Sequence, residues 1–288
     1  MKLLLNIIGA GHLGKTIGYL LVKHQLVNIG FIVNRSAAST SEAIKFFGEG
    51  NYCPTVEQLP AADITLITTS DDLILGMSEK LSNSQFLKKG SIVLHCSGSL
   101  TSDALIAIKQ KGCYVGSVHP MRSFAKPELS VKQYDGTYCA IEGDAQALAT
   151  MRYLFDSIGS TTYEIEKEKK CLYHAAGVFA SNYLVTLAHQ ALSCMKEAAV
   201  DNEMAMHVVT NIMKGTIANL EKTLSPLQAL TGPIKRGDLL TIKKHIENLP
   251  TAEQRNLYAV LGKATMDLTD HNEITKNKIL DAFTLSER

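Results

Sequence analysis

Two histidines and a lysine stand where the sequence could place them to move protons. His119 follows the apolar segment 114–118, a predicted strand, and Pro120 stiffens the chain directly after it. A histidine at the carboxyl end of a strand can titrate near neutral pH and reach a hydroxyl or carbonyl group. His119 is therefore a candidate proton donor or acceptor, and a histidine that only stabilises a turn is the structural alternative.

A second set of candidates lies on a predicted helix. Lys170, His174, Gly177 and Ser181 follow one another at spacings of four, three and four residues, so they share one helix face. Asn182 lies next to that face. We interpret Lys170, His174 and Asn182 as candidate catalytic residues and Ser181 as a candidate substrate-binding residue. In the structural alternative, the helix is partly exposed at its first turns, and the serine and asparagine contact other helices.

Two serines and an arginine could hold a substrate. Ser97 and Ser99 flank Gly98 after the predicted strand 91–95, where hydroxyl and backbone N–H groups could bind a ribose, an amide or an anion. An ordinary turn and helix cap would use the same residue types. Arg236 lies in a compact polar loop, 230–238, and could meet an acidic substrate group or a phosphate. An exposed connector with solvated charges is the alternative for that loop.

Composition argues against several other functions. The six cysteines include no Cys-x-x-Cys pair, and no second ligand pair accompanies His95-Cys96, so we expect no metal site and cysteines that are reduced and mostly buried. The 29 Lys and Arg residues are balanced by 28 Asp and Glu residues, which gives no basic field for nucleic acid. No apolar run reaches the ~20 residues of a membrane helix. We expect a cytoplasmic protein with a small-molecule substrate.

The element that must position these residues is the start of the chain. The apolar run 3–8 leads into Gly9-Ala10-Gly11-His12-Leu13-Gly14, and a helical pattern follows. This strand, G-x-G-x-x-G turn and helix are typical of a dinucleotide-binding site. Gly9 would allow the tight turn, Gly11 the approach of a pyrophosphate to the backbone, and Gly14 the close packing of helix on strand.

The next predicted strand, 29–33, indicates which nucleotide would bind. It ends in Asn34-Arg35-Ser36, where an NAD enzyme would carry an acid for the ribose 2′-hydroxyl. A guanidinium and short donors suit a 2′-phosphate instead, so we predict NADP(H), with a solvated surface arginine as the alternative. The complete predicted cofactor-binding set is Gly9, Ala10, Gly11, His12, Leu13, Gly14, Asn34, Arg35, Ser36, Thr69 and Ser70.

Further patterns predict an α/β domain over 1–163 and an all-α domain over 164–288. Strands are predicted at 64–69, 91–95, 114–118, 137–142 and 161–165, and the loops after the first three would meet at one sheet edge. Asp71 or Asp72 is predicted to cap a helix at 73–81, with only a minor role in the site. Later helices are predicted at 167–199, 203–224, 238–248, 251–267 and 274–283.

These motifs resemble a known superfamily that includes pyrroline-5-carboxylate reductases, β-hydroxyacid dehydrogenases and prephenate dehydrogenases. The resemblance implies a Rossmann-like N-terminal domain and a dimerising helical domain similar to the C-terminal domain of 6-phosphogluconate dehydrogenase. Within it, segments 9–14, 119–121, 173–176, 180–182, 231–233 and 236–238 resemble one family. Its members are Rossmann-like proteins with a C-terminal domain of unknown function, provisionally assigned as NADP oxidoreductases, whose substrate is not established.

Two other families resemble the chain in part. Prephenate dehydrogenases are similar at Ser99 and at 119–121, where their histidine binds the substrate hydroxyl, but Arg122-Ser123-Phe124 replaces the small residues that follow in that family. The resemblance implies a prephenate dehydrogenase-like oxidative decarboxylase as an alternative function, and this replacement argues against it. In β-hydroxyacid dehydrogenases a catalytic lysine precedes an asparagine on the interdomain helix, which Lys170 and Asn182 loosely resemble.

The combined expectation is an NADP(H)-dependent oxidoreductase. It would transfer hydride to or from a small carbonyl, imine or hydroxy-acid substrate in the interdomain cleft, with His119 or His174 exchanging the proton. A non-catalytic NADP(H)-binding redox sensor that acts through a protein partner is one alternative. A scaffold that binds no nucleotide is another. We also expect a homodimer, formed through apolar faces of the helical domain.

Overall fold

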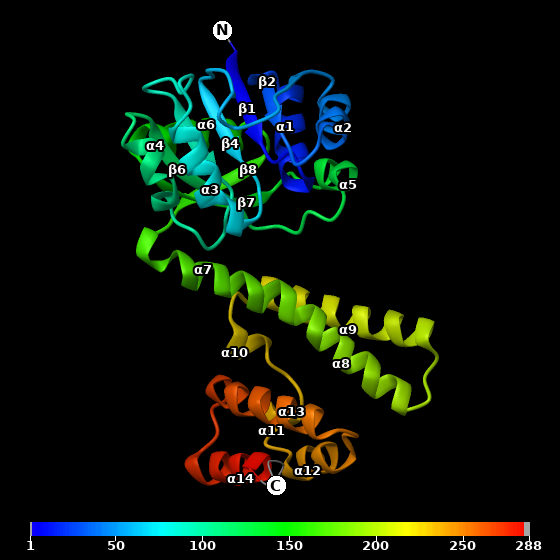
Figure 1. The fold of residues 1–288 in the computed structure, drawn as a ribbon. Helices are drawn as coiled ribbons and strands as arrows, with labels where there is room; N and C mark the ends of the chain where they lie inside the picture. The colour runs from blue at the N-terminus through cyan, green and yellow to red at the C-terminus, as the bar shows by residue number, and fades with distance from the viewer. Residues whose placement is uncertain (1, 285–288) are drawn as a thin grey trace. The chain divides into compact units, whose positions relative to one another are not determined.

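The structure is a computed structural model that describes residues 2–284. One eight-stranded sheet dominates its first part, with the strand order β3-β2-β1-β4-β5-β6-β7-β8 (Figure 1). The strands are β1 (Leu3–Ile8), β2 (Val27–Val33), β3 (Asn51–Tyr52), β4 (Ile64–Ile67), β5 (Ile92–His95), β6 (Tyr114–Pro120), β7 (Thr137–Gly143) and β8 (Ser160–Glu164). The predicted α/β fold is confirmed.

One strand of this sheet runs against its neighbour. The strands from β3 to β6 are parallel, whereas β7 is antiparallel to β6 and β8 is parallel to β7. Pairing with β7 lengthens β6 beyond its predicted end, because His119 lies opposite Ala140 and Pro120 opposite Cys139. The prediction that the strand ends at Val118, with His119 in the following turn, is therefore wrong.

Helices cover both faces of the sheet. The core on one face combines strand residues with side chains of α1 (His12–Lys23), α2 (Ala37–Phe47) and α6 (Ala145–Asp156). The core on the other face includes side chains of α3 (Asp71–Ser82), of the 3₁₀ turn Ser102–Leu105 and of α4 (Ile106–Lys109). Neighbouring strand residues such as Ile7 and Ile8 serve opposite faces, as expected for a sheet buried on both sides.

The helix predicted at 167–199 is broken into segments of different type. It starts with a 3₁₀ turn, Lys167–Lys169, continues as α7 (Lys170–Gly177), passes through a π-helical turn, Val178–Asn182, and resumes as α8 (Tyr183–Glu197). The chain divides into two compact units between Phe179 and Ala180, within the π-helical turn. The sheet, α7 and the segments between them form the first unit.

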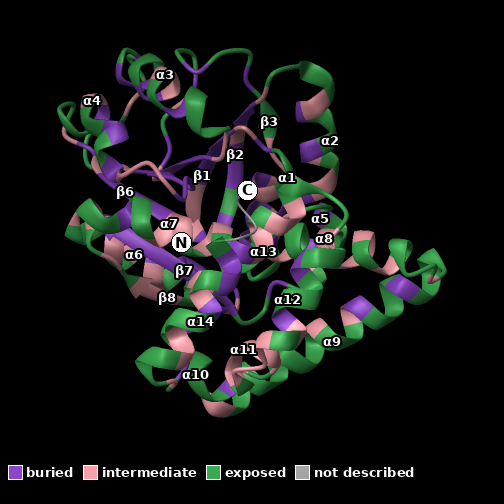
Figure 2. Cartoon of the chain, turned by 90° about the horizontal axis from the view of Figure 1, so that it is seen from below, coloured by how far each residue is buried: buried purple, intermediate pink, exposed green. Residues whose placement is uncertain are grey.

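The second unit is helical, as predicted. It contains α8, α9 (Asn202–Thr223), α10 (Pro226–Ala229), α11 (Pro233–Arg236), α12 (Leu239–Asn248), α13 (Ala252–Thr265) and α14 (Glu273–Thr284). Asp238 and Thr251 cap α12 and α13 by accepting the N–H groups of Thr241 and Gln254. A small core joins α12, α13 and α14, whereas α8 and α9 are largely exposed or half-buried (Figure 2). No helix within residues 2–284 is long and apolar enough to cross a membrane.

Candidate functional site

The glycine-rich turn between β1 and α1 is pressed onto the end of β4. Gly9 has φ +91°, and a Cβ atom there would lie 2.7 Å from Thr69 Cγ2, while one on Gly14 would lie 2.4 Å from Thr68 Oγ1. Side chains at either position would force the turn away from β4. A Cβ on Gly11 would meet nothing closer than 4.0 Å, so the backbone there is open to an approaching group.

Two buried polar atoms beside this turn have no partner. Asn34 accepts the N–H of Ala10 at 2.6 Å through its side-chain oxygen, but its amide nitrogen has no hydrogen-bond partner within residues 2–284. The hydroxyl of Thr69 is unpartnered in the same part of the chain. No described side chain caps the N-terminus of α1, which therefore offers backbone N–H groups and a positive dipole end. The residues at this turn thus fit a dinucleotide.

The other predicted cofactor contacts at the end of β2 are solvent-exposed. Arg35 is exposed and makes no hydrogen bond or ion pair with the described residues, whereas the hydroxyl of Ser36 caps α2 by accepting the N–H of Ser39 at 3.2 Å. His12, the first residue of α1, contacts the carbonyl oxygen of Phe124 through Nδ1 at 3.1 Å. Ser70 precedes α3 without donating or accepting a capping hydrogen bond through its side chain.

Three elements bring the two predicted histidines together. His119 comes from β6, His174 from α7, and the loop after β5 carries Gly98 between them. The imidazole ring centroids are 5.6 Å apart, and a Cβ on Gly98 would lie 2.3 Å from His174 Nδ1 and 2.8 Å from His119 Nε2. Only glycine fits there without displacing the rings. Nδ1 of His174 is buried and has no partner within the described chain.

Tyr173 orients the ring of His119. Its hydroxyl lies 2.9 Å from His119 Nδ1. Burial, and then the neighbouring Tyr163, raise the pKa of Tyr173, so its hydroxyl stays protonated and can donate to Nδ1. Donation of that proton to Nδ1 would place the ring proton of His119 on Nε2, the atom that faces Gly98. Burial, followed by the charges of His174 and Lys170, lowers the pKa of His119 to about 4, and the ring is therefore neutral at pH 7.

Asp71 fixes the serine loop beside the histidines. Its Oδ2 accepts hydrogen bonds from the hydroxyls of Ser97 at 2.7 Å and Ser99 at 2.8 Å. The oxygen of Ser97 also accepts the N–H groups of Ser99 and Leu100. The prediction that Asp71 or Asp72 caps α3 is wrong: both residues lie inside the first turn, after the cap position, Ser70. Asp71 instead reaches across to the loop after β5, a role that the sequence analysis missed.

A buried histidine, His95, makes hydrogen bonds that hold the loop after β5 in place. His95 Nδ1 accepts the N–H of Ser97 at 3.2 Å, and Nε2 lies 3.0 Å from the carbonyl oxygen of Thr101. Burial and the nearby charge of Lys170 lower the pKa of His95 to about 4, consistent with a neutral ring that serves both contacts. No cluster of His, Cys, Asp or Glu side chains in the described chain could hold a metal ion. Four of the six cysteines are buried, as predicted for most of them.

Lys170 is buried in an ion pair. Its side chain is 1% exposed and donates to Glu142 Oε1 at 3.1 Å and to the hydroxyl of Ser117. The Glu142 carboxylate also accepts the backbone N–H and the hydroxyl of Ser102 at 2.8 and 2.7 Å. Burial lowers the pKa of Lys170, and Glu142 opposes that shift. Sequence analysis missed Glu142, whose only sequence signal was a lone acid in an apolar strand.

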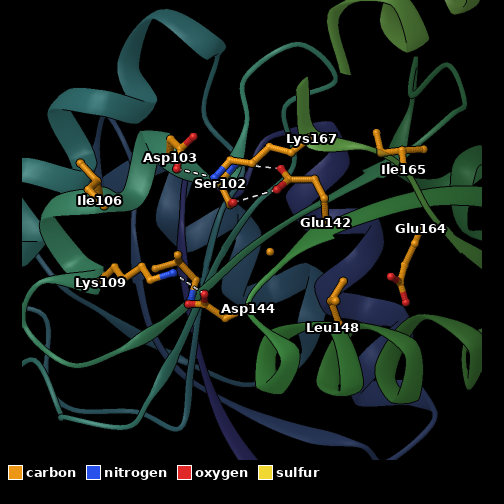
Figure 3. A pocket seen from close by; sticks show the side chains of 12 residues that line it. Ser102, Asp103, Ile106, Lys109, Glu142, Asp144, Leu148, Glu164, Ile165 and Lys167 are labelled. Atoms are coloured by element: carbon orange, nitrogen blue, oxygen red, sulfur yellow. Dashed lines mark hydrogen bonds and ion pairs between the residues drawn. The ribbon is translucent and has the colours of Figure 1, made fainter. Parts of the chain in front are cut away.

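Glu142 also lines a cavity of about 310 Å³. Figure 3 shows it together with other lining residues, among them Lys109 and Asp144. Among the charged lining residues of the cavity, Lys109 contacts Asp144 at 2.5 Å and Lys167 contacts Asp103. The other two, Glu142 and Glu164, pair with Lys170 and Arg152. None of the predicted site residues lines this cavity. It is therefore separate from the histidine site, which we define as His119, His174, Tyr173, the 97–99 loop and Asp71.

Three predicted site residues belong to the second unit. Ser181 and Asn182 lie in the π-helical turn, and Arg236 is the last residue of α11. All three are exposed in that unit. The first unit by itself therefore assembles the histidines and the serine loop, and the predicted contributions of Ser181, Asn182 and Arg236 stay predictions.

Two family models match the chain over separate ranges. A Rossmann-like domain matches residues 1–120, and a domain of unknown function (DUF2520) matches residues 137–265. The chain combines a Rossmann-like domain with a DUF2520 domain. His119 lies in the Rossmann-like match, whereas Tyr173 and His174 lie in the DUF2520 match, so the histidine site draws on both.

Solved structures share this fold along nearly the whole chain. A Bacteroides fragilis protein provisionally assigned as an NADP oxidoreductase has a TM-score of 0.74 at 19% identity, covering 92% of this chain and 98% of its own. The Thermotoga maritima protein TM1727 has a TM-score of 0.71 at 25% identity, covering 96% and 98%. An imine reductase of Myxococcus stipitatus in complex with NADP⁺ has a TM-score of 0.65 at 14% identity, covering 97% and 99%. No curated protein matches the chain.

Proposed function

We propose that the protein is an NADP(H)-dependent oxidoreductase that transfers hydride to or from a small carbonyl, imine or hydroxy-acid substrate. The observation that carries the proposal is the pair of unpartnered buried polar atoms, on Asn34 and Thr69, beside a glycine turn that tolerates no side chain at Gly9 or Gly14. Buried polar groups normally have partners, so these two favour a ligand at the turn.

The preference for NADP(H) rests on the end of β2. Arg35 is exposed and makes no ion pair with a described acid. The residues on either side of it, Asn34 and Ser36, are uncharged and would not repel a phosphate. A guanidinium binds phosphate through two parallel hydrogen bonds. The imine reductase of similar fold binds NADP⁺, and one of its variants has also been solved with NAD⁺, so the fold alone does not select the nucleotide.

The chain's own residues would bind the substrate and handle its proton. The bound nicotinamide supplies the hydride chemistry. His119 presents Nε2 toward Gly98, where it can donate to or accept from a substrate oxygen or nitrogen, and His174 is the second candidate for that proton. The remaining predicted residues proposed to orient the substrate are Ser97, Ser99, Ser181, Asn182 and Arg236. The ammonium of Lys170 is buried and paired with Glu142, so it does not reach a substrate.

A thermal-shift titration tests the cofactor. NADPH, NADP⁺, NADH and NAD⁺ are compared on the wild type, on Arg35→Ala and on Lys111→Ala, an exposed cation outside the proposed site. NADPH and NADP⁺, which carry the 2′-phosphate, should stabilise the wild type and Lys111→Ala by about 2.7 kcal/mol when the nucleotide concentration is 100 times its dissociation constant. Arg35→Ala should lose that preference.

The same titration can reject the proposal. If no nucleotide raises the melting temperature, the glycine turn binds no dinucleotide and the oxidoreductase proposal fails. If NADPH binds but exchanges no hydride with any carbonyl or imine of a broad panel, the redox-sensor alternative takes its place.

We also propose a homodimer formed through the second unit. Large apolar side chains on α8 and α9 are exposed, including Val185 at 70% and Ile212 at 67%. Of the described residues of these two helices, only Ala205 and Val209 are fully buried. Exposed apolar side chains in this number support burial against a second copy.

A further inference from the structure

The hydroxyl of Tyr173 has one proton and two hydrogen-bond acceptors for it. Its oxygen lies 2.9 Å from His119 Nδ1 and is also hydrogen-bonded to the hydroxyl of Tyr163, on the edge strand β8. The two phenol rings meet edge to face, with centroids 6.3 Å apart. A contact with the carbonyl oxygen of His119, at 3.5 Å, is too long to compete. Tyr163, Tyr173 and His119 therefore form one hydrogen-bonded chain, which lies entirely in the first unit.

The protons of this chain have two arrangements. In the first, Tyr163 donates to Tyr173, which donates to Nδ1, so the ring proton of His119 is on Nε2. In the second, Nδ1 carries the ring proton and donates to Tyr173, which donates to Tyr163, and Nε2 is bare. A change from one arrangement to the other shifts each proton by one hydrogen bond and leaves every group neutral.

Nε2 of His119 is the end of the chain that faces the site. It lies beside Gly98, together with Nδ1 of His174, which is buried and unpartnered within residues 2–284. Burial, then the charges of His174 and Lys170, keep the His119 ring neutral at pH 7 by lowering its pKa, and the charge of Asp71 opposes them.

A neutral ring can release its proton only with help at the other nitrogen. If Nε2 of His119 gave up the single ring proton alone, an imidazole anion would form in a largely buried place, which is strongly unfavourable. Tyr173 avoids that anion, because its hydroxyl can give a proton to Nδ1 while Nε2 releases one. Tyr163 can replace the proton of Tyr173 in the same way.

We infer that Tyr163 and Tyr173 form a proton relay for His119, which lets Nε2 give a proton to the substrate, or take one, while the ring stays neutral. The inference rests on the proposed function and deepens it, because it assigns a route to the proton that accompanies hydride transfer. Tyr163 and Tyr173 are positioning residues that act through His119.

The transfers of this relay balance. In the direction of reduction, the N–H bond at Nε2 breaks and its proton goes to the substrate oxygen or nitrogen that must be protonated. The proton of Tyr173 goes to Nδ1, that of Tyr163 goes to Tyr173, and water supplies one to Tyr163, which is half-buried. Oxidation runs the same transfers in reverse. Water that enters after product release can return a proton to Nε2, and the chain then moves back.

NMR of protein with isotope-labelled histidine shows where the ring proton lies, because protonated and bare ring nitrogens differ in chemical shift. The proteins are the wild type, Tyr163→Phe and Tyr138→Phe, and His119→Asn identifies the signals. Tyr138 is the matched control, an exposed tyrosine on the neighbouring strand β7. We expect both tautomers of His119 in the wild type and in Tyr138→Phe. Tyr163→Phe leaves Nδ1 as the acceptor for Tyr173, so the ring proton should lie on Nε2 alone.

Reduction of a panel of small carbonyls and imines by NADPH, in mixtures of H₂O and D₂O, tests the transfer itself. Tyr163→Phe should lower kcat at least about tenfold and leave KM unchanged. Several protons move together in the wild type, so its kcat should fall along a curve as the deuterium fraction rises, and Tyr163→Phe should make the curve straight. A purely structural tyrosine would not change that shape. The wild-type curve needs no variant to fold.

Two results would overturn the inference: a single tautomer of His119 that Tyr163→Phe leaves unchanged, or a Tyr163→Phe enzyme with the kcat of the wild type. If the tautomer responds as expected but no compound of the panel is reduced, the proposed function is rejected and the relay has no reaction to serve. If a compound is reduced but the tautomer does not respond, the relay alone is rejected.

Discussion

The sheet and the α8–α9 hairpin use apolar side chains in opposite ways. The sheet buries them on both faces in two extended cores, whereas α8 and α9 leave residues such as Val185 and Ile212 mostly exposed. A surface that exposes apolar groups at this density normally meets another surface. The first unit therefore holds its site residues in place by its own packing, and the hairpin is the part of the chain that is suited to a partner.

The largest effect should come from the buried ion pair of the first unit. Glu142→Gln leaves the charge of Lys170 in the interior without a counter-ion, and we expect it to lower the free energy of unfolding by about 3–5 kcal/mol. Urea unfolding followed by circular dichroism measures this loss. The double variant Glu142→Leu with Lys170→Met removes both charges and should recover most of it. A loss below about 1 kcal/mol in Glu142→Gln would mean that water reaches the pair.

The same pair shows why the site was only partly predictable from the sequence. Lys170, His174 and His119 were found because helix spacing and strand ends are local patterns. Glu142 and Asp71 were not, because their partners are 28 and 26 residues away along the chain. A carboxylate in an apolar strand or at a helix start has a common local explanation, and only the tertiary structure shows which partner it has.

The fold was easier to predict from the sequence than the site was, for the same physical reason. β1 was predicted residue for residue because a fully buried parallel strand is a continuous apolar run bounded by a turn. The helix starts near Asp238 and Thr251 were predictable as well, because the cap that each residue makes is a contact over three residues. The extension of β6 to Pro120, the short helix α5 (Pro127–Lys132) and the π-helical turn were missed, since each depends on packing rather than on local pattern.

Acid should destabilise the first unit through its buried histidines. Burial lowers the pKa values of His119 and His95 to about 4, from 6.5 in the unfolded chain. The unfolded state therefore takes up protons first. The stabilisation from each neutral ring is complete above pH 6.5 and is lost as the pH falls from 6.5 to about 4, at up to about 3 kcal/mol per ring.

The variant His119→Asn isolates one of these two contributions. It removes one titrating ring, and the decline of unfolding free energy between pH 6.5 and about 4 should be about half as steep as in the wild type. Urea unfolding at a series of pH values measures the slope. An unchanged slope would show that His119 is solvated and able to carry charge in the folded protein. In that event it could also donate a proton at neutral pH.

The smallest effect on folding should come from the α8–α9 hairpin, whose exposed apolar side chains contrast with the buried ones of the sheet. Ile212→Ser replaces an exposed apolar residue of α9, so it should change the free energy of unfolding at low protein concentration by no more than about 0.5 kcal/mol. It should nevertheless shift the oligomeric state from dimer toward monomer, which light scattering over a range of concentrations measures. Lys196→Ser, at the end of α8, serves as a polar control and should leave the mass unchanged.

A wild type that stays monomeric at every concentration would show that the exposed face of α8 and α9 serves something other than a second copy. A dimer that Ile212→Ser leaves intact would place its interface elsewhere. Either result would separate the hairpin's exposure from dimerisation while leaving the histidine site, whose residues all lie in the first unit, as it stands.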